Sequence, residues 1–361
     1  MHGQAAPAPG VLTIDLGALV ENWRRVAREV APARAAAVVK ADAYGLGAAR
    51  VVPALLAAGC RDFFVANLVE ALAIRDLVPG DALLGVLNGL HPGGEAFAAQ
   101  ARITPVLNSV AQARRWQAFA RPAILQVDTG MARHGVSMDE AAALAGDADF
   151  RAAVPVLAVM SHLACADEPD RAENAAQLAR FVEASALFPG VAHCFANSGG
   201  VQLGAAYHGD MVRAGLCLYG AEPADGRNPP FLPVVRLEAR VLQTRTVPAG
   251  TGVGYGQTWQ AERETRLALL SIGYADGFPR SLSGRGAAWV QGALLPIVGR
   301  VSMDVTIVDA SALPEGALAE GDLVEIIGPH RPIAAVAQEA GTIAYEILTQ
   351  LGGRYQRIYV N

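Results

Sequence analysis

Lys40 is the only lysine in this chain of 361 residues. Lysine and arginine together number 29, so the other 28 of these basic residues are arginine. Arginine keeps its proton near neutral pH, whereas a lysine amine can lose a proton and attack a carbonyl group. A coding bias toward arginine explains why lysines are rare but leaves open why one remains. A chemical and a structural role for Lys40 are therefore equally compatible with the composition.

The elements that must position Lys40 are short apolar runs in the first part of the chain. Eight runs are typical of buried strands, and several are separated by segments whose length and apolar spacing suit helices. The runs cover residues 35–40, 63–66, 82–86, 103–106, 123–127, 156–160, 192–195 and 211–213, and the helical segments cover residues 51–58, 68–77, 110–119 and 171–187. Eight such periods predict an α/β fold, a (β/α)8 barrel of the TIM type.

The last part of the chain consists of β-branched, alternating segments broken by proline and glycine. It predicts a smaller, mainly β C-terminal domain with one helical stretch at residues 333–351. The predicted strands cover residues 235–247, 266–272, 288–298, 303–308 and 323–327. A break around residues 229–233 predicts domains at 1–233 and 234–361, and a strand at residues 11–14 could pair with either domain.

Enzymes built on such barrels carry their chemistry on the loops that follow the carboxyl ends of the strands. In this chain Lys40 closes the first apolar run, and polar or basic residues follow several later runs. These residues are Arg133 after the fifth run, His162 after the sixth, Ser198 after the seventh and Arg213 at the end of the eighth. The sequence therefore predicts that candidate site residues gather on one rim.

The composition disfavours several classes of protein. A hydrophobic content of 52% with 17% charged residues does not suit a disordered chain, and no window approaches the roughly 18 consecutive apolar residues of a membrane span. A net charge of −5 disfavours nucleic acid as a partner. Residues 1–10 lack the features of a secretory signal, so a loose tail and a cytoplasmic location are expected. The four cysteines lack metal-ligand spacing, so reduced thiols and no metal site are expected.

Residues 38–45, with the sequence VVKADAYG, place a tyrosine four residues after Lys40. This segment resembles the pyridoxal-phosphate attachment motif of bacterial alanine racemases. Further motifs similar to those of this family follow in order: DTGMAR at 128–133, SH at 161–162, NS at 197–198, RAGLCLYG at 213–220, GYG at 254–256, GYADG at 273–277, VSMD at 301–304 and YE at 345–346. The resemblance spans nearly the whole chain, and it implies a barrel-type isomerase that depends on pyridoxal phosphate.

The resemblance also implies a cofactor site. Pyridoxal 5'-phosphate would be bound to Lys40 as a Schiff base, and Arg213 would lie against the pyridine nitrogen. The phosphate would be contacted by Tyr44, Ser198, Gly215, Leu216 and Tyr345. A permanently protonated guanidinium group beside the ring nitrogen discourages protonation of the ring. This favours return of a proton to the α-carbon over transamination.

Racemisation needs one group that removes the α-proton and another that returns a proton on the opposite face. Lys40 is the expected first base. The resemblance implies that the second is Tyr255 of the partner subunit, in a homodimer with shared active sites. A phenol has a reference pKa of about 10 and needs assistance near neutral pH. The resemblance suggests His162, within the cofactor site, as the helper.

Recognition of a small amino acid is implied as well. The guanidinium fork of Arg133 would bind the substrate carboxylate, together with the backbone N–H of Met303 of the partner subunit, which precedes Asp304. The residues at the entrance to the site would be Asp167, Tyr274, Arg280 and Arg300. Tyr255 and Tyr345 would narrow the pocket to a methyl side chain, so alanine is the expected substrate. Activity on serine stays open, as does the choice between D-alanine biosynthesis, as a peptidoglycan precursor, and degradation of D-alanine.

Two positions depart from the family pattern. Gln126 stands two residues before Asp128, where many relatives have a lysine modified to a carbamate that buttresses the arginine. A neutral amide can accept a hydrogen bond from Arg133 but supplies no negative charge. Either a bound anion supplies that charge or Arg133 is held more loosely. Ser302 stands where many relatives have cysteine, with a small expected consequence.

Other interpretations are weaker. The DTG sequence at 128–130 also resembles the active-site tripeptide of aspartic proteases, but that chemistry needs two such carboxylates and the chain has one DTG. The glycine run at 250–256 lacks the third glycine of a dinucleotide-binding motif. A non-catalytic pyridoxal-phosphate-binding protein would usually lack the β domain. A barrel-type amino-acid decarboxylase would normally pair the pyridine nitrogen with a carboxylate, where this sequence has Arg213.

Overall fold

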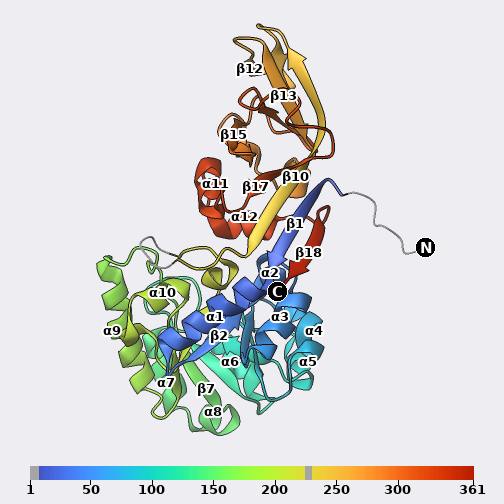
Figure 1. The fold of residues 1–361 in the computed structure, drawn as a ribbon. Coiled ribbons are helices and arrows are strands. Elements are labelled where there is room, and N and C mark those ends of the chain that lie inside the picture. The colour runs from blue at the N-terminus through green and yellow to red at the C-terminus, as the bar shows by residue number, and fades with distance from the viewer. Residues whose placement is uncertain (1–7, 224–229) are drawn as a thin grey trace, which may run out of the picture. The chain divides into compact units, whose positions relative to one another are not determined.

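Eight parallel strands close into a barrel in the computed structural model of the protein, which describes residues 8–223 and 230–361 (Figure 1). Residues 1–7 of the predicted tail and residues 224–229, beside the predicted domain boundary, lie outside the described residues. The barrel strands are β2 (Arg34–Val38), β3 (Asp62–Val65), β4 (Leu83–Val86), β5 (Thr104–Leu107), β6 (Ala123–Gln126), β7 (Val156–Met160), β8 (Ala192–Cys194) and β9 (Met211–Ala214). β9 closes the barrel on β2, with Met211 opposite Arg34. The predicted barrel is therefore confirmed.

The chain divides into two units. The barrel unit comprises Leu19–Leu232, and the β unit comprises Pro233–Asn361 together with the described residues up to Ala18. The barrel strands are buried on both faces, as in other parallel sheets covered by helices, which explains why their sequences are continuous apolar runs. In β3, for example, Phe63 and Phe64 are fully buried.

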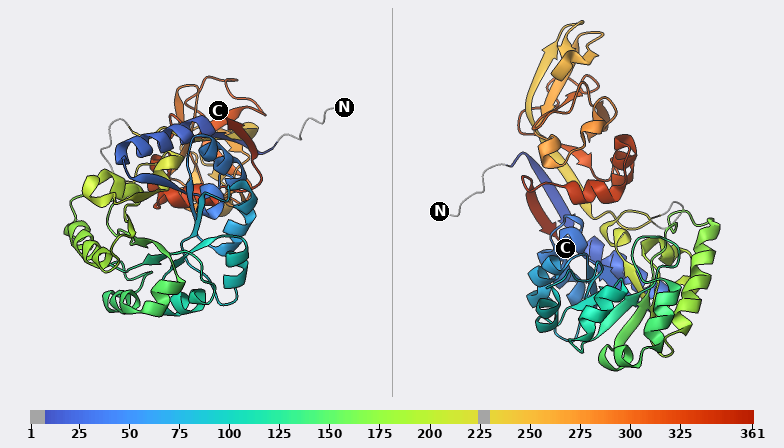
Figure 2. Two further views of the ribbon diagram at one scale, coloured as in Figure 1. Left: turned by 90° about the horizontal axis from the view of Figure 1, so that it is seen from below. Right: turned by 180° about the vertical axis from the view of Figure 1, so that it is seen from behind.

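Helices surround the barrel strands, as the view from below shows (Figure 2). They are α1 (Leu16–Val30), α3 (Ala48–Ala57), α4 (Leu68–Ile74), α5 (Glu95–Gln100), α6 (Val110–Gln117), α7 (Met138–Gly146), α8 (Ala148–Ala153), α9 (Ala172–Ala186) and α10 (Ser198–Gln202). Two of them begin with a capping box: Glu70 accepts a hydrogen bond from the backbone N–H of Asn67 at the start of α4, and Glu140 does the same for Ser137 at the start of α7. No helix in the described parts of the chain is long and apolar enough to cross a membrane.

The β unit is built around the long strand β10 (Val235–Val247). The first half of β10 pairs with β1 (Gly10–Asp15) and β17 (Leu323–Ile327), and after a register shift near Val241 its second half pairs with β13 (Thr265–Leu270). The other strands of this sheet are β14 (Ala287–Val290), β15 (Ala293–Pro296), β16 (Thr306–Asp309) and β18 (Gln356–Val360). β1 thus begins at the last residue of the predicted tail and belongs to the β unit. The predicted fold class, a barrel with a smaller and mainly β unit, is confirmed.

Several element boundaries differ from the prediction. The strand predicted at 288–298 is a hairpin of β14 and β15, because the backbone reverses at Gly292, where φ is 81°. The strand predicted at 303–308 begins only at residue 306. The helix predicted at 333–351 is two helices, α11 (Ile333–Ala340) and α12 (Ala344–Gln350), because Gly341 ends the first in a left-handed conformation. No predicted range covers the helices α1, α5, α7 and α8 or the strand β18.

Candidate active site

Lys40 lies just beyond the end of β2, at the start of a left-handed turn. The strand predicted at 35–40 was too long, because β2 ends at Val38. The short element α2 (Lys40–Tyr44) follows, and φ lies between 53° and 56° at the four residues from Ala41 to Tyr44. The N–H of Gly45 closes the turn with a 2.7 Å hydrogen bond to the carbonyl of Ala41. Lys40 therefore leaves the barrel rim at the carboxyl end of its first strand.

This turn is costly because none of its four left-handed residues is glycine. Left-handed helical backbone costs an L-residue roughly 1–2 kcal/mol through contact of the Cβ atom with the following carbonyl. Hydrogen bonds compensate on the far side of the turn: Asp42 accepts the N–H of Ala48 at 2.7 Å, and its carbonyl accepts the N–H of Gly47 at 2.9 Å. Strain of this kind is often found at functional sites.

We expect Ala41→Gly to raise the free energy of unfolding by about 0.5–1 kcal/mol, because glycine adopts positive φ without the Cβ contact. Ala41 is exposed, so the change removes little packing. The matched control is Ala143→Gly, an exposed position inside α7, which should lower the free energy of unfolding by about 1 kcal/mol. Denaturant unfolding followed by circular dichroism measures both. Equal destabilisation by the two substitutions would refute a strained turn.

The environment of Lys40 favours the neutral amine. Burial lowers the pKa of Lys40, and the nearby positive charge of Arg133 and, to a smaller extent, that of Arg213 lower it further. Glu70 acts in the opposite direction. A lysine that loses its proton more easily than in water is suited to attack a carbonyl group or to accept a proton from carbon.

Hydroxyl and backbone N–H groups from three elements lie beside Lys40's turn. The Tyr44 ring stacks on Tyr219, with 4.4 Å between ring centroids, and a Cβ atom at Gly215 would lie only 2.5 Å from the Tyr44 hydroxyl. Ser198 Oγ accepts the N–H of Gly215 at 2.9 Å. Leu216 begins the short helix η3 (Leu216–Tyr219), so its N–H has no acceptor within that helix. Tyr44, Ser198, Gly215 and Leu216 are thus brought together, and such groups suit an anion such as a phosphate.

Arg213 is buried and fixed by the ends of neighbouring strands. Its Nη2 atom donates to the carbonyl of Ser161 at 2.7 Å and to Nδ1 of His162 at 3.1 Å, and its Nη1 atom donates to the carbonyl of Cys194 at 3.0 Å. Both Nη atoms are therefore engaged. The hydrogen bonds of Arg213 to other described residues are made by its Nη atoms and not by Nε, which could therefore donate to a ligand.

His162 is held as a neutral ring by Arg213. A guanidinium group can only donate, so Nδ1 of His162 accepts and the ring proton of the neutral form lies on Nε2. Burial lowers the pKa of His162 well below its ordinary value of 6.5, and the positive charges of Arg213 and Arg133 act in the same direction. His162 therefore stays uncharged at neutral pH.

This depressed pKa makes stability depend on pH. Below about pH 6.5 the unfolded chain takes up a proton on His162 that the folded chain does not, so stability is lost as the pH falls through that value. His162→Gln keeps an acceptor for Arg213 but removes the titration. We expect the free energy of unfolding of the variant to fall less steeply between about pH 6.5 and pH 5, by up to roughly 1.4 kcal/mol per pH unit. Identical slopes in the two proteins would contradict the neutral ring.

The loop that carries Arg133 is organised by Asp128. Oδ1 of Asp128 accepts the backbone N–H groups of Gly130, Met131 and Ala132 at 2.9, 2.9 and 3.2 Å, and these bonds lower the pKa of the carboxyl group although its burial acts to raise it. The carboxylate of the DTG sequence therefore shapes a loop, which agrees with the rejection of aspartic-protease chemistry. Arg133 itself is exposed and makes no hydrogen bond to a described residue.

Gln126 does not hold Arg133 directly. Its side chain is buried, and Nε2 donates to the carbonyl of His134 at 3.2 Å. No hydrogen bond joins Gln126 and Arg133 in the described structure. The Gln126 side chain instead binds the backbone of the loop at His134, the residue that follows Arg133.

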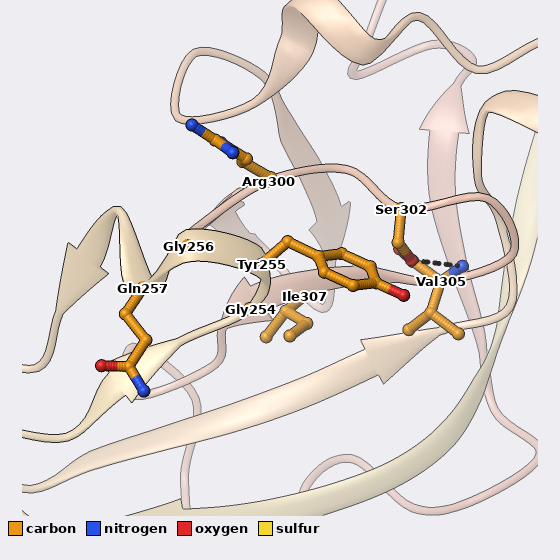
Figure 3. Close-up of a pocket in the computed structure, with 8 residues that line it drawn as sticks. All are labelled: Gly254, Tyr255, Gly256, Gln257, Arg300, Ser302, Val305 and Ile307. Atoms are coloured by element: carbon orange, nitrogen blue, oxygen red, sulfur yellow. Dashed lines mark hydrogen bonds between the residues drawn. The ribbon is translucent and has the colours of Figure 1, made fainter.

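In the β unit, Tyr255 lines a cavity of about 780 Å³. Tyr255 begins the short helix η4 (Tyr255–Gln257), which lies between the paired strands β11 (Gly252–Val253) and β12 (Trp259–Gln260). Its ring extends toward Ser302 and Val305, whereas Arg300 points the other way (Figure 3). The side chain is 73% exposed, and its hydroxyl has no hydrogen-bond partner in the described part of the chain.

Met303 and Asp304 lie in a tight turn beside this cavity. Ser302 Oγ accepts the N–H of Val305 at 3.2 Å, and Met303 is exposed. Asp304 accepts a 2.7 Å hydrogen bond from Nη1 of Arg354. The same guanidinium group binds both carboxylate oxygens of the buried Asp276, at 2.6 and 2.8 Å. Asp304 is thus engaged in holding its own turn in place.

The remaining predicted site residues lie on exposed stretches of the two units. Tyr274, Arg280 and Arg300 are exposed residues of the β unit, and Tyr345 lies on α12 with 38% of its surface exposed. The carbonyl of Arg280 accepts a hydrogen bond from Ser283, whose hydroxyl accepts the N–H of Val301, so the segments bearing Arg280 and Arg300 are connected. Asp167 is exposed in the barrel unit, in the loop between β7 and α9.

Sequence reasoning missed Glu70 and Arg354. Glu70 binds the N–H of Ala41, directly after Lys40, and Arg354 binds Asp276 and Asp304. The capping-box spacing of Asn67 and Glu70 was a readable signal for the helix start. No local signal links either residue to the site, because their partners lie 29 and 50 or more positions away in the chain.

Comparison with known families gives matches along almost the whole chain. The family model described as "Alanine racemase, N-terminal domain" matches residues 14–223, and that described as "Alanine racemase, C-terminal domain" matches residues 234–359. The chain is 53% identical to a catabolic alanine racemase of Agrobacterium fabrum, over 99% of the chain and 93% of that protein. It is 49% identical to an alanine racemase of Brucella canis, over 98% of the chain and 94% of that protein.

Solved structures give the same match. An alanine racemase of Bartonella henselae with covalently bound pyridoxal phosphate superposes with a TM-score of 0.95 at 44% identity, covering 98% of the chain and all of that structure. A biosynthetic alanine racemase of Pseudomonas aeruginosa superposes with a TM-score of 0.91 at 35% identity, again covering 98% and 100%.

Proposed function

The chain belongs to the alanine racemase family, an isomerase family, and from this premise we propose that it interconverts L-alanine and D-alanine with pyridoxal phosphate bound to Lys40. The observation that carries the proposal is the convergence of the sole lysine, with its lowered pKa, and a fixed, buried Arg213 in one site. The Bartonella relative binds the same cofactor covalently, which supports the assignment.

The described residues fit this cofactor. The close approach of Tyr44 to Gly215 requires glycine at that position, because a Cβ atom would clash with the Tyr44 hydroxyl. The Tyr44 and Ser198 hydroxyls, with the backbone at Gly215 and Leu216, would hold the phosphate, and Tyr345 would add a further hydroxyl. Nε of Arg213 would donate to the ring nitrogen, because both Nη atoms are engaged elsewhere. His162 would fix the orientation of Arg213.

When bound, pyridoxal phosphate supplies an electron-withdrawing ring that makes the α-proton of an attached amino acid acidic. The chain's own residues then bind the substrate and move the proton. Arg133 would bind the substrate carboxylate with help from the N–H of Met303 of the partner subunit, in a turn that Asp304 and Arg354 hold in place within each chain. Lys40, as a neutral amine, would accept the α-proton on one face.

The second base is proposed to be Tyr255 of the partner subunit in a homodimer with shared active sites. Tyr255 is exposed on its own chain and its hydroxyl is unpaired among the described residues, so it is available to another chain. Its hydroxyl would return a proton to the α-carbon on the face opposite Lys40. Asp167, Tyr274, Arg280 and Arg300 would border the entrance, and Tyr255 and Tyr345 would limit the pocket to a methyl side chain.

Incubation of purified protein with a panel of L-amino acids, followed by chiral analysis of the products, tests the proposed function. We expect L-alanine to yield D-alanine, with L-serine and larger amino acids converted more slowly because the two tyrosines restrict the pocket. Release of carbon dioxide without D-alanine would establish a decarboxylase instead. An unchanged substrate would support a binding protein without catalytic activity.

A further inference from the structure

The carboxylate of Glu70 joins the left-handed turn of Lys40 to the neighbouring strand. Oε1 of Glu70 accepts the N–H of Ala41 at 2.9 Å. Oε2 accepts the N–H groups of Ala66 and Asn67 at 2.7 and 3.2 Å, directly after β3 and at the start of α4. The capping role alone would require only the bond to Asn67. The bond to Ala41 is additional, and it falls on the residue that follows Lys40.

The backbone of Lys40 is held on both sides by the same neighbouring segment. Before Lys40, the N–H of Val39 donates to the carbonyl of Phe64 in β3 at 2.8 Å. After Lys40, the N–H of Ala41 donates to Glu70. The second bond is made at the first residue of the turn with positive φ, where the backbone is strained and where loss of an anchor would loosen it most.

We propose that Glu70 is a positioning residue for Lys40: by anchoring Ala41 to the end of β3, its carboxylate fixes the strained turn and with it the position of the Lys40 amine. Among the charged groups that act most strongly on Lys40, Glu70 is the acidic one, and it opposes burial, Arg133 and Arg213. It therefore limits how far the amine is driven toward its neutral form. This proposal rests on the proposed function, because it assigns Glu70 to the same reacting amine.

The single lysine makes a direct test possible without cofactor or substrate. In the cofactor-free full-length protein, an amine-reactive label can modify only Lys40 and the N-terminal amine, and peptide mass spectrometry separates the two. The pH dependence of labelling at Lys40 reports the protonation of its amine. Glu70→Gln removes the charge and leaves one oxygen to serve the three backbone N–H groups. We expect its labelling curve to shift to lower pH, because the charge that stabilised the protonated amine is gone.

Activity of the holoenzyme provides the second readout. We expect Glu70→Gln to lower kcat on the order of 10-fold or more with a smaller change in KM, because a displaced amine slows proton transfer more than it weakens substrate binding. Glu70→Asp, which keeps the charge but is one methylene shorter, should restore the labelling curve and only part of kcat.

The matched control is Glu140→Gln, which removes the same carboxylate from the capping box of α7, where Glu140 serves Ser137 and touches no residue beside Lys40. It should leave the labelling curve and kcat unchanged. The proposal would be overturned if Glu70→Gln had the labelling curve and kcat of the wild-type protein. It would also be overturned if Glu140→Gln lost as much activity as Glu70→Gln. If the wild-type protein failed to racemise alanine, the labelling comparison would still decide whether Glu70 acts on the Lys40 amine, independently of the proposed function.

Discussion

Replacing Lys40 by arginine is expected to slow alanine racemisation by at least about 10³-fold. An arginine side chain has a similar length and keeps the positive charge, but it neither loses its proton near neutral pH nor forms the covalent bond to the cofactor. Both roles proposed for Lys40, cofactor attachment and proton removal, are lost together. Chiral chromatography of alanine over time measures the rate in both directions.

The control for this loss is chemical rescue. Lys40→Ala should regain part of its activity when a small alkylamine is added, because the amine can occupy the space of the missing side chain and accept the proton. Lys40→Arg should show no rescue, because the arginine fills that space. Circular dichroism should show an intact barrel in both variants. An arginine variant that retains more than about a tenth of the wild-type rate would show that Lys40 is not a base of the reaction.

Tyr255→Phe is expected to reduce racemisation by roughly 10²- to 10⁴-fold, the usual contribution of a positioned acid or base. The substitution removes only the hydroxyl, which is exposed on its own chain and contributes no hydrogen bond within the described residues. The fold should therefore be unaffected. The matched control is Tyr207→Phe, in the barrel unit, whose ring stacks on Phe195 and which has no proposed role in proton transfer.

Exchange of the α-hydrogen of alanine in heavy water distinguishes a mechanism with two bases from a mechanism with one. With Tyr255→Phe, the enantiomer whose α-hydrogen faces Lys40 should still exchange with deuterium, while the other enantiomer should exchange far more slowly. Equal slowing for both enantiomers would indicate that Tyr255 acts on binding and not on one face of the α-carbon. Mixed dimers of Lys40→Arg and Tyr255→Phe chains should recover one working site, because each site would draw the two bases from different subunits.

The barrel could be predicted from the sequence because its strands are buried on both faces. A strand buried on both faces, such as the one that contains Phe63 and Phe64, is a continuous apolar run that can be recognised without knowing its neighbours in space. Eight such runs separated by helical segments are compatible with few folds other than a barrel. The same pattern placed Lys40 and Arg213 at strand ends and Ser198 after a strand. In the structure Lys40 lies just after β2 and Ser198 after β8, whereas Arg213 lies within β9. The roles of Tyr255 and Met303 were predicted from the family resemblance alone, because the pattern of apolar and polar residues around them does not indicate a catalytic or binding role.

The fine structure of the site could not be predicted in this way. The turn from Ala41 to Tyr44 has an ordinary sequence, and its positive φ values depend on anchors such as Glu70 that come from another part of the chain. The reversal at Gly292 and the break at Gly341 were missed because each glycine lies within a longer stretch that was taken as one element, and the positive φ of a glycine is not visible in the sequence. Arg354 is one of 28 arginines, and only its place beside the buried Asp276 distinguishes it from the others.

Borohydride reduction of the purified holoenzyme, followed by peptide mass spectrometry, is the most direct measurement of the central claim. Reduction makes the bond between pyridoxal phosphate and a lysine amine permanent, and this chain has a single lysine. We predict one modified peptide, spanning Lys40, whose added mass is that of the reduced cofactor. Cofactor released in full after reduction, or found only on the N-terminal amine, would contradict the assignment of Lys40 as the residue that binds the cofactor and begins the reaction.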